Sequence, residues 1–442
     1  MQECARQEHT KGISNMRTES HLALINQIPK VPTMPDAMLA DAQTSEESID
    51  EILQDALRTI RDHLGIEVAF VSEFLEGRRF FRYVDATVEN PPISVGDSDP
   101  LDQSYCQSVV DGQLPQLIHD ATRIPLALAM PATTALPVGA HISVPIYFSD
   151  GRIYGTFCCF KAAPDQTLIE RDLAMMQIFA AFTGKQLERQ IAVNRTHDEM
   201  AERVQSIIDS QNFNIVYQPI YDFKIDRIVG FESLARFPVM PIRPPNIWFD
   251  EATQVGLVEA LEMTVIAEAL RSLEHLPPDI YLSLNVSPAT VMSGAITHML
   301  KHVPLDRIVL EITEHVSIPD YAQLIKVLQP LREKGARLAV DDAGAGYASF
   351  RHILRLEPDL IKLDISLTRD IDTDRTRRAL AAALTRFAEE TGSRIIAEGV
   401  ETEAELNVLR NLRITKAQGY LIGRPMPLAN AVALQGHRQA SA

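Results

Sequence analysis

The stretch Leu338-Ala339-Val340-Asp341-Asp342 is a short apolar run that ends in two acids. Short apolar runs of this kind are typical of strands that are buried on both faces, as in parallel sheets. Similar runs recur through the second half of the chain, and each is followed by a polar residue. They are Gly230-Phe231-Glu232, Leu282-Ser283-Leu284-Asn285, Ile308-Val309-Leu310-Glu311, Leu360-Ile361-Lys362-Leu363-Asp364 and Ile395-Ile396-Ala397-Glu398. The repetition predicts a series of buried strands with a polar residue at the same end of each.

Longer amphipathic stretches separate these runs and predict helices at residues 254–273, 321–334 and 375–390. Two further apolar runs, Ile215-Val216-Tyr217 and Ile228-Val229-Gly230-Phe231, open the series. Repeated strand–helix units of this number indicate an α/β fold. Their total length fits a (β/α)8-type (TIM-like) barrel.

In such a barrel, the C-terminal ends of the strands converge on one mouth, where active sites are built. The polar residues expected there are Glu232, Asn285, Glu311, Asp341, Asp342, Lys362, Asp364 and Glu398, with Gln418 at a last short strand. Carboxylates packed closely repel one another unless cations lie between them. Oxygen donors without His or Cys suit hard cations such as Mg2+ or Mn2+. Solvated acids at loop starts are the alternative for any single residue, but they do not explain the repetition.

The C-terminal region resembles an EAL-type cyclic di-GMP phosphodiesterase domain over essentially its whole length. The matching motifs are Tyr217-Gln218-Pro219-Ile220, Gly230-Phe231-Glu232-Ser233-Leu234-Ala235-Arg236, Asn285-Val286-Ser287-Pro288, Glu311-Ile312-Thr313-Glu314, Asp341-Asp342-Ala343-Gly344-Ala345-Gly346, Ile361-Lys362-Leu363-Asp364, Ala397-Glu398-Gly399-Val400-Glu401-Thr402, Gln418-Gly419-Tyr420 and Gly423-Arg424-Pro425. The sequence departs from the usual pattern at Ser233, where Ala is usual, and at Ala343, where Phe is usual.

The resemblance implies a role for each matched residue. The metal ligands would be Glu232, Asn285, Glu311, Asp341, Asp342 and Asp364. The catalytic residues would be Glu398, Lys362 and Glu232, with Glu398 as the base or water-orienting carboxylate. The residues that contact substrate would be Arg236, Gln418 and Leu234. The residues that support the loop after Asp341-Asp342 would be Glu314 and Glu401.

The resemblance also implies the reaction. Two divalent cations, Mg2+ or Mn2+, would serve the hydrolysis of cyclic di-GMP to linear 5′-pGpG, and Ca2+ would inhibit it. Two alternatives stay open, and Ala343 supports the first of them. One is a weak or inactive receptor that binds cyclic di-GMP without turnover. The other is a scaffold that contacts another protein and binds no nucleotide.

The N-terminal half resembles a GAF domain, a sensor domain with an α+β fold. The resemblance rests on Gly65-Ile66-Glu67-Val68-Ala69-Phe70-Val71, Ser104-Tyr105-Cys106-Gln107, Val110-Asp111-Gly112 and the predicted hairpin Ser143-Val144-Pro145-Ile146 with Gly151-Arg152-Ile153-Tyr154-Gly155-Thr156. It implies that this domain regulates the barrel. The sequence does not name its small ligand, if it has one.

These patterns predict four segments: a flexible tail at residues 1–45, a GAF-like domain at 46–185, a helical linker at 186–208 and an EAL domain at 209–442. Leu187, Ile191, Met200, Val204 and Ile207 lie near one face of the linker helix. That face predicts either a coiled-coil seam between the subunits of a homodimer or a single helix packed on its own domain.

The chain carries a net charge of −17, which disfavours nucleic acid polymers and anionic membranes as partners. No run of about 18 apolar residues predicts a membrane span. The polar first 30 residues lack the apolar core of a secretory signal. We therefore expect a cytoplasmic signalling protein.

Overall fold

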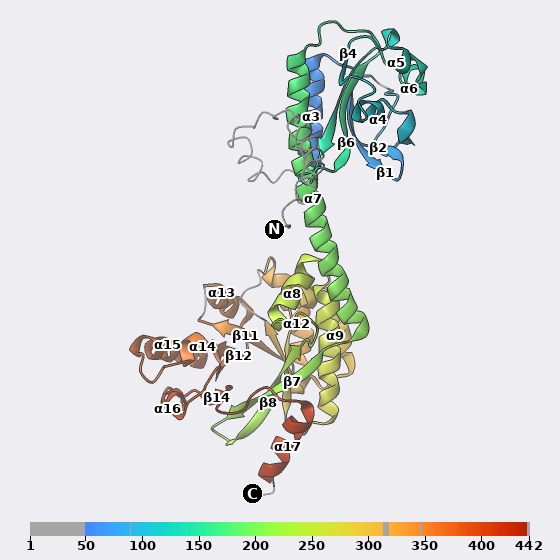
Figure 1. Cartoon of the computed structure of the whole chain (residues 1–442). Coiled ribbons are helices and arrows are strands. Elements are labelled where there is room, and N and C mark those ends of the chain that lie inside the picture. The colour runs from blue at the N-terminus through green and yellow to red at the C-terminus, as the bar shows by residue number, and fades with distance from the viewer. Residues whose placement is uncertain (1–48, 89, 313–317, 345–346, 440–442) are drawn as a thin grey trace, which may run out of the picture. The chain divides into compact units, whose positions relative to one another are not determined.

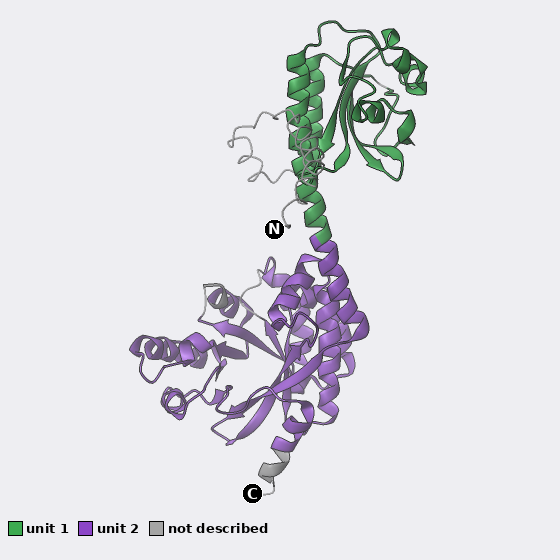
Figure 2. Cartoon of the chain, viewed as in Figure 1, with its two compact units in different colours: residues 1–195 green, residues 196–442 purple. Residues whose placement is uncertain are grey.

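The computed structural model describes residues 49–88, 90–312, 318–344 and 347–439 of the chain. The chain divides into two compact units, residues 1–195 and residues 196–442, shown in different colours in Figure 2. Each unit has hydrophobic clusters of its own, so each is described separately.

Unit 1 contains one antiparallel sheet with the strand order β3-β2-β1-β6-β5-β4 (Figure 1). The strands are β1 Val68–Leu75, β2 Arg78–Ala86, β3 Ser98–Pro100, β4 Leu117–Ile118, β5 Ala140–Tyr147 and β6 Ile153–Lys161. Glu76 and Gly77 join β1 to β2 with positive φ angles of 50° and 72°. Two positive φ values match the twist of the flanking strands. The predicted hairpin is confirmed by the pairing of β5 with β6, and β1 pairs with β2 in a second hairpin.

Helices cover both faces of this sheet. The long helices α3 Ile49–Leu64 and α7 Glu170–Ser210 place Leu53, Leu57 and Met176 in a cluster with sheet residues such as Val144. The short helices α4 Tyr105–Val110, α5 Pro125–Ala129 and α6 Pro131–Ala135 contribute to a second cluster, which includes sheet residues such as Phe70. Two 3-10 turns, Leu101–Gln103 and Ala121–Arg123, complete the unit. The predicted α+β architecture is therefore correct.

Most of the apolar residues predicted on one face of the linker helix are buried within the chain. Leu187 is buried in the core of unit 1, whereas Val204 and Ile207 are buried beside Trp248 in unit 2. Ile191, between them, is 48% exposed. Three of the five residues therefore pack within their own units, whereas Ile191 is free of both hydrophobic clusters.

Unit 2 is a closed barrel with the strand order β10-β11-β12-β13-β14-β7-β8-β9. The strands are β7 Asn214–Asp222, β8 Arg227–Arg236, β9 Tyr281–Asn285, β10 Ile308–Ile312, β11 Arg337–Ala343, β12 Leu360–Leu363, β13 Arg394–Ala397 and β14 Lys416–Ala417. The predicted TIM-like barrel is confirmed. One strand is reversed, because β7 runs antiparallel to both β8 and β14 while the other described pairs are parallel. A tight hairpin joins β7 to β8, which forces the reversal.

The described helices of unit 2 are α8 Pro245–Gln254, α9 Val258–Leu270, α10 Pro288–Met292, α11 Ala295–Met299, α12 Tyr321–Glu333, α13 Tyr347–Leu356, α14 Ile365–Thr368, α15 Arg375–Thr391, α16 Glu403–Asn411 and α17 Leu428–Gln439. Short 3-10 segments lie at Arg271–Glu274, Leu300–His302 and Leu305–Arg307. The helix predicted at residues 254–273 is confirmed as α9 and the 3-10 segment that follows it, but α9 begins at Val258, whereas Gln254 is the last residue of α8. Gly256 lies between them with φ +71°, a left-handed conformation that a right-handed helix cannot include.

Among the described residues, no helix is long and apolar enough to cross a membrane. The barrel interior has an apolar layer formed by Ile220, Val229, Tyr281, Val309, Ala339, Leu360 and Ile396. The acids predicted from the sequence lie beyond this layer, towards the C-terminal ends of the strands. The layer therefore forms a base beneath them.

Candidate metal centre

The strand register brings the predicted acids to one place. Glu232 in β8 pairs with Ser283 in β9, and Asn285, two residues further along β9, pairs with Glu311 in β10. Because alternate residues of a strand face the same side, this register turns Glu232, Asn285 and Glu311 towards the barrel axis. Glu232 lies within β8 and not after its end, because β8 continues to Arg236.

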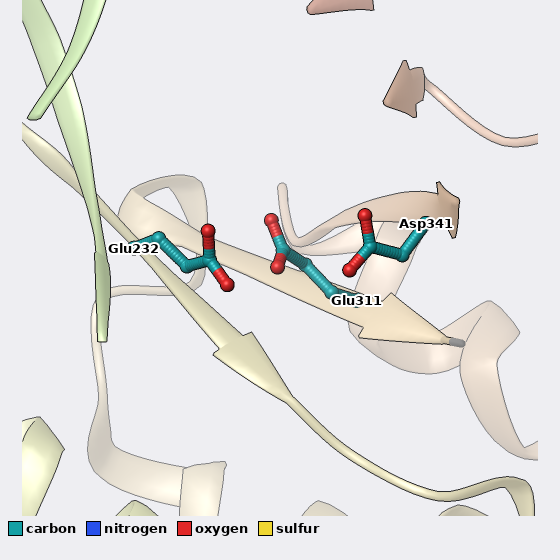
Figure 3. A group of neighbouring side chains, drawn as sticks. All are labelled: Glu232, Glu311 and Asp341. Atoms are coloured by element: carbon teal, nitrogen blue, oxygen red, sulfur yellow. The ribbon is translucent and has the colours of Figure 1, made fainter. Parts of the chain in front are cut away.

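Two groups of carboxylates result. The ligand oxygens of Glu232, Glu311 and Asp341 lie within 4.8 Å of one another, as do those of Asp341, Asp342 and Glu398. Figure 3 shows the carboxylates of the first group facing one another. Asp341 belongs to both groups, so the two groups are adjacent. Asp342 adopts a φ of +53°, so the successive acids Asp341 and Asp342 both join the second group in spite of the strand alternation.

Lys362 lies among these acids. Its Nζ atom is 2.7 Å from Glu398, 2.9 Å from Glu311, 3.1 Å from Asp341 and 3.4 Å from Glu232. The side chain of Lys362 is 1% exposed. One ammonium group therefore balances only one of four buried carboxylates, and an excess of negative charge remains.

The acids differ in how easily they ionise. Burial raises the pKa of Glu311 to about 8, with Glu232 and Asp341 adding to the effect and Lys362 opposing it. Burial, followed by the charge of Asp341, also raises the pKa of Glu398 above its ordinary value. Burial opposes ionisation of Glu232 too, but Lys362 and nearby hydrogen-bond donors outweigh it and lower its pKa. Closely packed carboxylates with shifted and different pKa values are common at functional sites.

Amide and hydroxyl groups fix the orientation of two acids. Asn285 Nδ2 donates to Glu232 Oε1 at 3.1 Å, and Gln418 Nε2 donates to Glu232 Oε2 at 2.6 Å. Ser283 Oγ donates to Glu311. With both oxygens of Glu232 held, its carboxylate is positioned by the protein itself.

A cavity of about 310 Å3 opens beside these acids. Seven of the predicted site residues line it: Glu232, Leu234, Asp341, Lys362, Glu398, Glu401 and Gln418. Arg236 follows Leu234 at the end of β8, and its guanidinium donates to the carbonyl of Ala235. Glu401 forms an ion pair with Arg369.

Two predicted residues stand apart from these contacts. Asp364 caps α14 by accepting a hydrogen bond from the amide of Ser366 at 2.8 Å, and it belongs to neither acid group among the residues described. Glu314, predicted to support the loop, lies outside the described residues.

Sequence reasoning assigned no role to Gln218 or Ser283, although both touch the site. Gln218 Oε1 accepts from Gln418 Nε2 at 3.0 Å and lines the cavity. Ser283 contacts Glu311. The signal for Ser283 was its position two residues before Asn285, which puts both side chains on the same face of a strand. For Gln218, the signal was its place in a quoted motif.

The donor set fits divalent cations. The two groups offer only carboxylate oxygens, with an amide oxygen available on Asn285, and such ligands suit hard cations. The negative charge that Lys362 leaves unbalanced would also be offset by cations. Glu232, Glu311 and Asp341 could hold one ion, and Asp341, Asp342 and Glu398 a second beside it.

Fold and site together define a class: a TIM-like barrel with a buried, oxygen-donor acidic centre at the C-terminal ends of its strands. Family models agree with this description. The EAL domain model matches residues 201–425, and the GAF domain model matches residues 48–187. The chain belongs to the EAL domain family and carries a GAF domain before the EAL domain.

Similar proteins include two curated bacterial relatives. The cyclic di-GMP phosphodiesterase NbdA of Pseudomonas aeruginosa is 30% identical over 254 residues, which are 54% of this chain and 32% of NbdA. The probable cyclic di-GMP phosphodiesterase PdeD of Escherichia coli is 28% identical over 225 residues, 49% of this chain and 42% of PdeD. The chain thus spans well under half the length of these relatives.

A solved structure of the EAL enzyme Bd1971 in its cGMP-bound form is similar over both units. It covers 84% of this chain and 93% of its own, with a TM-score of 0.52 and 19% identity. At that identity the match supports the fold only.

Proposed function

We propose that the chain is a metal-dependent phosphodiesterase that hydrolyses cyclic di-GMP to linear 5′-pGpG. The observation that carries the proposal is the convergence of Glu232, Glu311 and Asp341 within 4.8 Å in an EAL domain. The substrate is inferred from the similarity to NbdA, a cyclic di-GMP phosphodiesterase, and PdeD, a probable one.

The site residues have separate roles, and the first is to bind metal ions. Glu232, Asn285, Glu311, Asp341 and Asp342 hold two divalent cations, Mg2+ or Mn2+, with Asp364 more loosely associated. When bound, such cations activate a water molecule and offset charge that develops on the phosphodiester. Ca2+ occupies the same ligands without supporting turnover.

The chain's own side chains position the attacking water and the substrate, and they take part in proton transfer. Glu398 is the carboxylate that orients or deprotonates the attacking water. Lys362, 2.7 Å from Glu398, holds that carboxylate in place and brings a positive charge to the cavity wall. Water adds to phosphorus, the bond to the 3′ oxygen breaks, and that oxygen takes up a proton. Gln418, Leu234 and Arg236 contact the dinucleotide.

The test is hydrolysis of cyclic di-GMP by the purified full chain with Mg2+ or Mn2+, followed by chromatography of the linear product. Glu232→Gln keeps the shape of the side chain but removes its charge, and we expect turnover to fall by about 100-fold or more. Glu259→Gln, on the exposed surface of α9, is the matched control and should retain activity. Equal turnover by the Glu232 variant and the parent would refute the assignment.

A second reading is a receptor that binds cyclic di-GMP without cleaving it, favoured by Ala343 at a position where the family usually has Phe. Binding of cyclic di-GMP in Ca2+ with no product in Mg2+ or Mn2+ would establish it. No binding in Ca2+ would instead favour a protein-interaction scaffold.

We also propose that the GAF domain regulates the barrel in a cytoplasmic homodimer. The support is the single helix α7, which contributes core residues to both units. Removal of residues before about 194 should change the turnover rate or the oligomeric state, measured by kinetics and light scattering. Unchanged turnover in an unchanged oligomer would refute regulation through this helix.

A further inference from the structure

The barrel has a second polar surface at the end opposite the acidic centre. Tyr281, Arg337 and Arg394 are the first residues of β9, β11 and β13. Each precedes a predicted site residue on the same chain segment by four positions: Asn285, Asp341 and Glu398, respectively. An even spacing puts both side chains on the same face of a strand. The chain segments of β11 and β13 therefore each carry an arginine at one end and an acid towards the other.

These residues line an open cavity of about 650 Å3, which we call the floor cavity. Its charged lining residues are Lys224, Arg307, Arg337, Arg394 and Lys416 on the positive side and Asp222, Asp279 and Asp306 on the negative side. The lining thus carries two more positive than negative charges. That balance is notable in a chain with a net charge of −17.

Several of these charges are already occupied. Lys416 Nζ lies 2.6 Å from Asp222 Oδ2, and Asp279 pairs with Arg227. Arg307 donates to four backbone carbonyls, among them those of Ile280 at 3.0 Å and Pro277 at 2.9 Å. These groups shape the wall of the cavity and are not available to a ligand.

Arg337 and Arg394, unlike the charged residues above, have side chains that are available to a ligand. Among the described residues, no carboxylate lies within 4.0 Å of either guanidinium. Arg337 is half-buried and stacks on the ring of Tyr281, with Cζ 4.3 Å from the ring centroid. Burial is the main cause that lowers the pKa of Arg337; the charge of Arg394 also lowers it, while Tyr281 and the more distant acids Asp359 and Asp306 oppose this effect. Because neither guanidinium is held in an ion pair, both can contact a bound anion.

Tyr281 supplies a second, independent observation. Its side chain lines the floor cavity and is 5% exposed, yet its hydroxyl has no hydrogen-bond partner in the part of the chain described. A buried hydroxyl without an acceptor is costly and rare in native proteins. The ring packs against Gly230, where an added Cβ would come within 2.6 Å of ring atoms, so its position is fixed by the backbone.

We infer that the floor cavity is a binding site for a small phosphomonoester. Arg337 and Arg394 are the phosphate ligands, because guanidinium groups bind phosphate with paired hydrogen bonds. The two surplus positive charges match the charge of a phosphomonoester near neutral pH. The cavity is much larger than a phosphate ion and lies within the usual range for small-molecule sites. Ile225, Val229 and Pro278 in its wall would contact the organic part.

The experiment is calorimetric titration of the full chain in a metal chelator, which removes metal-mediated phosphate binding at the acidic centre. The probes are ribose 5-phosphate and guanosine 5′-monophosphate, with ribose and guanosine as unphosphorylated partners. We expect both phosphates to bind and both unphosphorylated partners to fail. Arg337→Gln and Arg394→Gln should each weaken binding by about ten- to hundred-fold.

Two controls locate the site. Arg386→Gln changes an arginine on α15 that is 71% exposed, and it should leave the affinity unchanged. Asp341→Asn changes the acidic centre and should not weaken phosphate binding. Arg394 is exposed, so its variant should fold even if Arg337→Gln does not. The inference is overturned if neither phosphate binds, or if Arg394→Gln binds as tightly as the parent, or if Asp341→Asn abolishes binding.

Discussion

Replacement of Lys362 by Met should destabilise the metal-free protein strongly. Lys362 is 1% exposed and forms ion pairs with four carboxylates at 2.7–3.4 Å. Met keeps a similar length and apolar stem but removes the only cation among these four acids in the described part of the site. The buried negative charges would then face one another without compensation.

The size of the effect follows from this loss. Breaking a buried ion pair by removing one partner costs about 3–5 kcal/mol, because the other charge stays buried and unpaired. Loss of one ammonium that serves several acids should fall at or above the middle of that range. For a unit of this size, about 3–5 kcal/mol corresponds to a fall in Tm of roughly 6–20 °C.

Thermal unfolding of the full chain in chelator, followed by circular dichroism, measures this fall. Lys326→Met changes an exposed lysine of α12 and is the matched control, which should melt with the parent. Divalent cations should raise the Tm of Lys362→Met more than that of the parent, because they would replace the missing charge. A Tm for Lys362→Met within about 2 °C of the parent in chelator would refute the view that Lys362 stabilises the acidic centre.

Two further predictions concern other buried positions. Burial, with the nearby charge of Arg79, lowers the pKa of His141 from 6.5 to about 3. The unfolded chain therefore binds a proton below pH 6.5 that the folded chain does not, and unit 1 should lose about 2 kcal/mol between pH 6.5 and 5. Urea midpoints at the two pH values should show this loss, and His141→Phe should reduce it. Ala343 is 1% exposed and pairs with Leu363, so Ala343→Phe should cost about 1–3 kcal/mol by overpacking. An unchanged urea midpoint for Ala343→Phe would show that the site has room for the usual family residue.

The sequence was sufficient to predict the barrel because its buried strands are short, apolar and repeated. It could not show that β7 is antiparallel to its neighbours, since an apolar run has the same pattern in either direction. It also placed the start of a helix at Gln254, whereas α9 begins at Val258. Gly256 lies between these two residues, and a single glycine inside a helical pattern is often tolerated, so the pattern alone did not reveal a left-handed turn.

The sequence predicted which residues form the acidic centre but not the distances and hydrogen bonds between them. The residue types and their places after apolar runs indicated which side chains would meet. Nothing in a one-dimensional pattern gives the 2.7 Å contact between Lys362 and Glu398, or the hydrogen bonds that hold both oxygens of Glu232. These depend on strand register. Register is set by long-range pairing, such as that of Glu232 with Ser283.

The same register explains why charge is separated along the barrel axis. A strand of five residues has three side chains on its inner face, at its start, middle and end. In β9, the end residue Asn285 contacts Glu232, the middle residue Ser283 contacts Glu311, and the first residue Tyr281 lies beneath Arg337. In β11, which is two residues longer, Arg337 and Asp341 occupy the first and fifth positions. A ligand at Arg337 would therefore act on the same strands that position the acids, about 13 Å away at the rise of a β-strand. If phosphate binding at the floor cavity changes turnover of cyclic di-GMP, these shared strands are the shortest physical connection between the two sites.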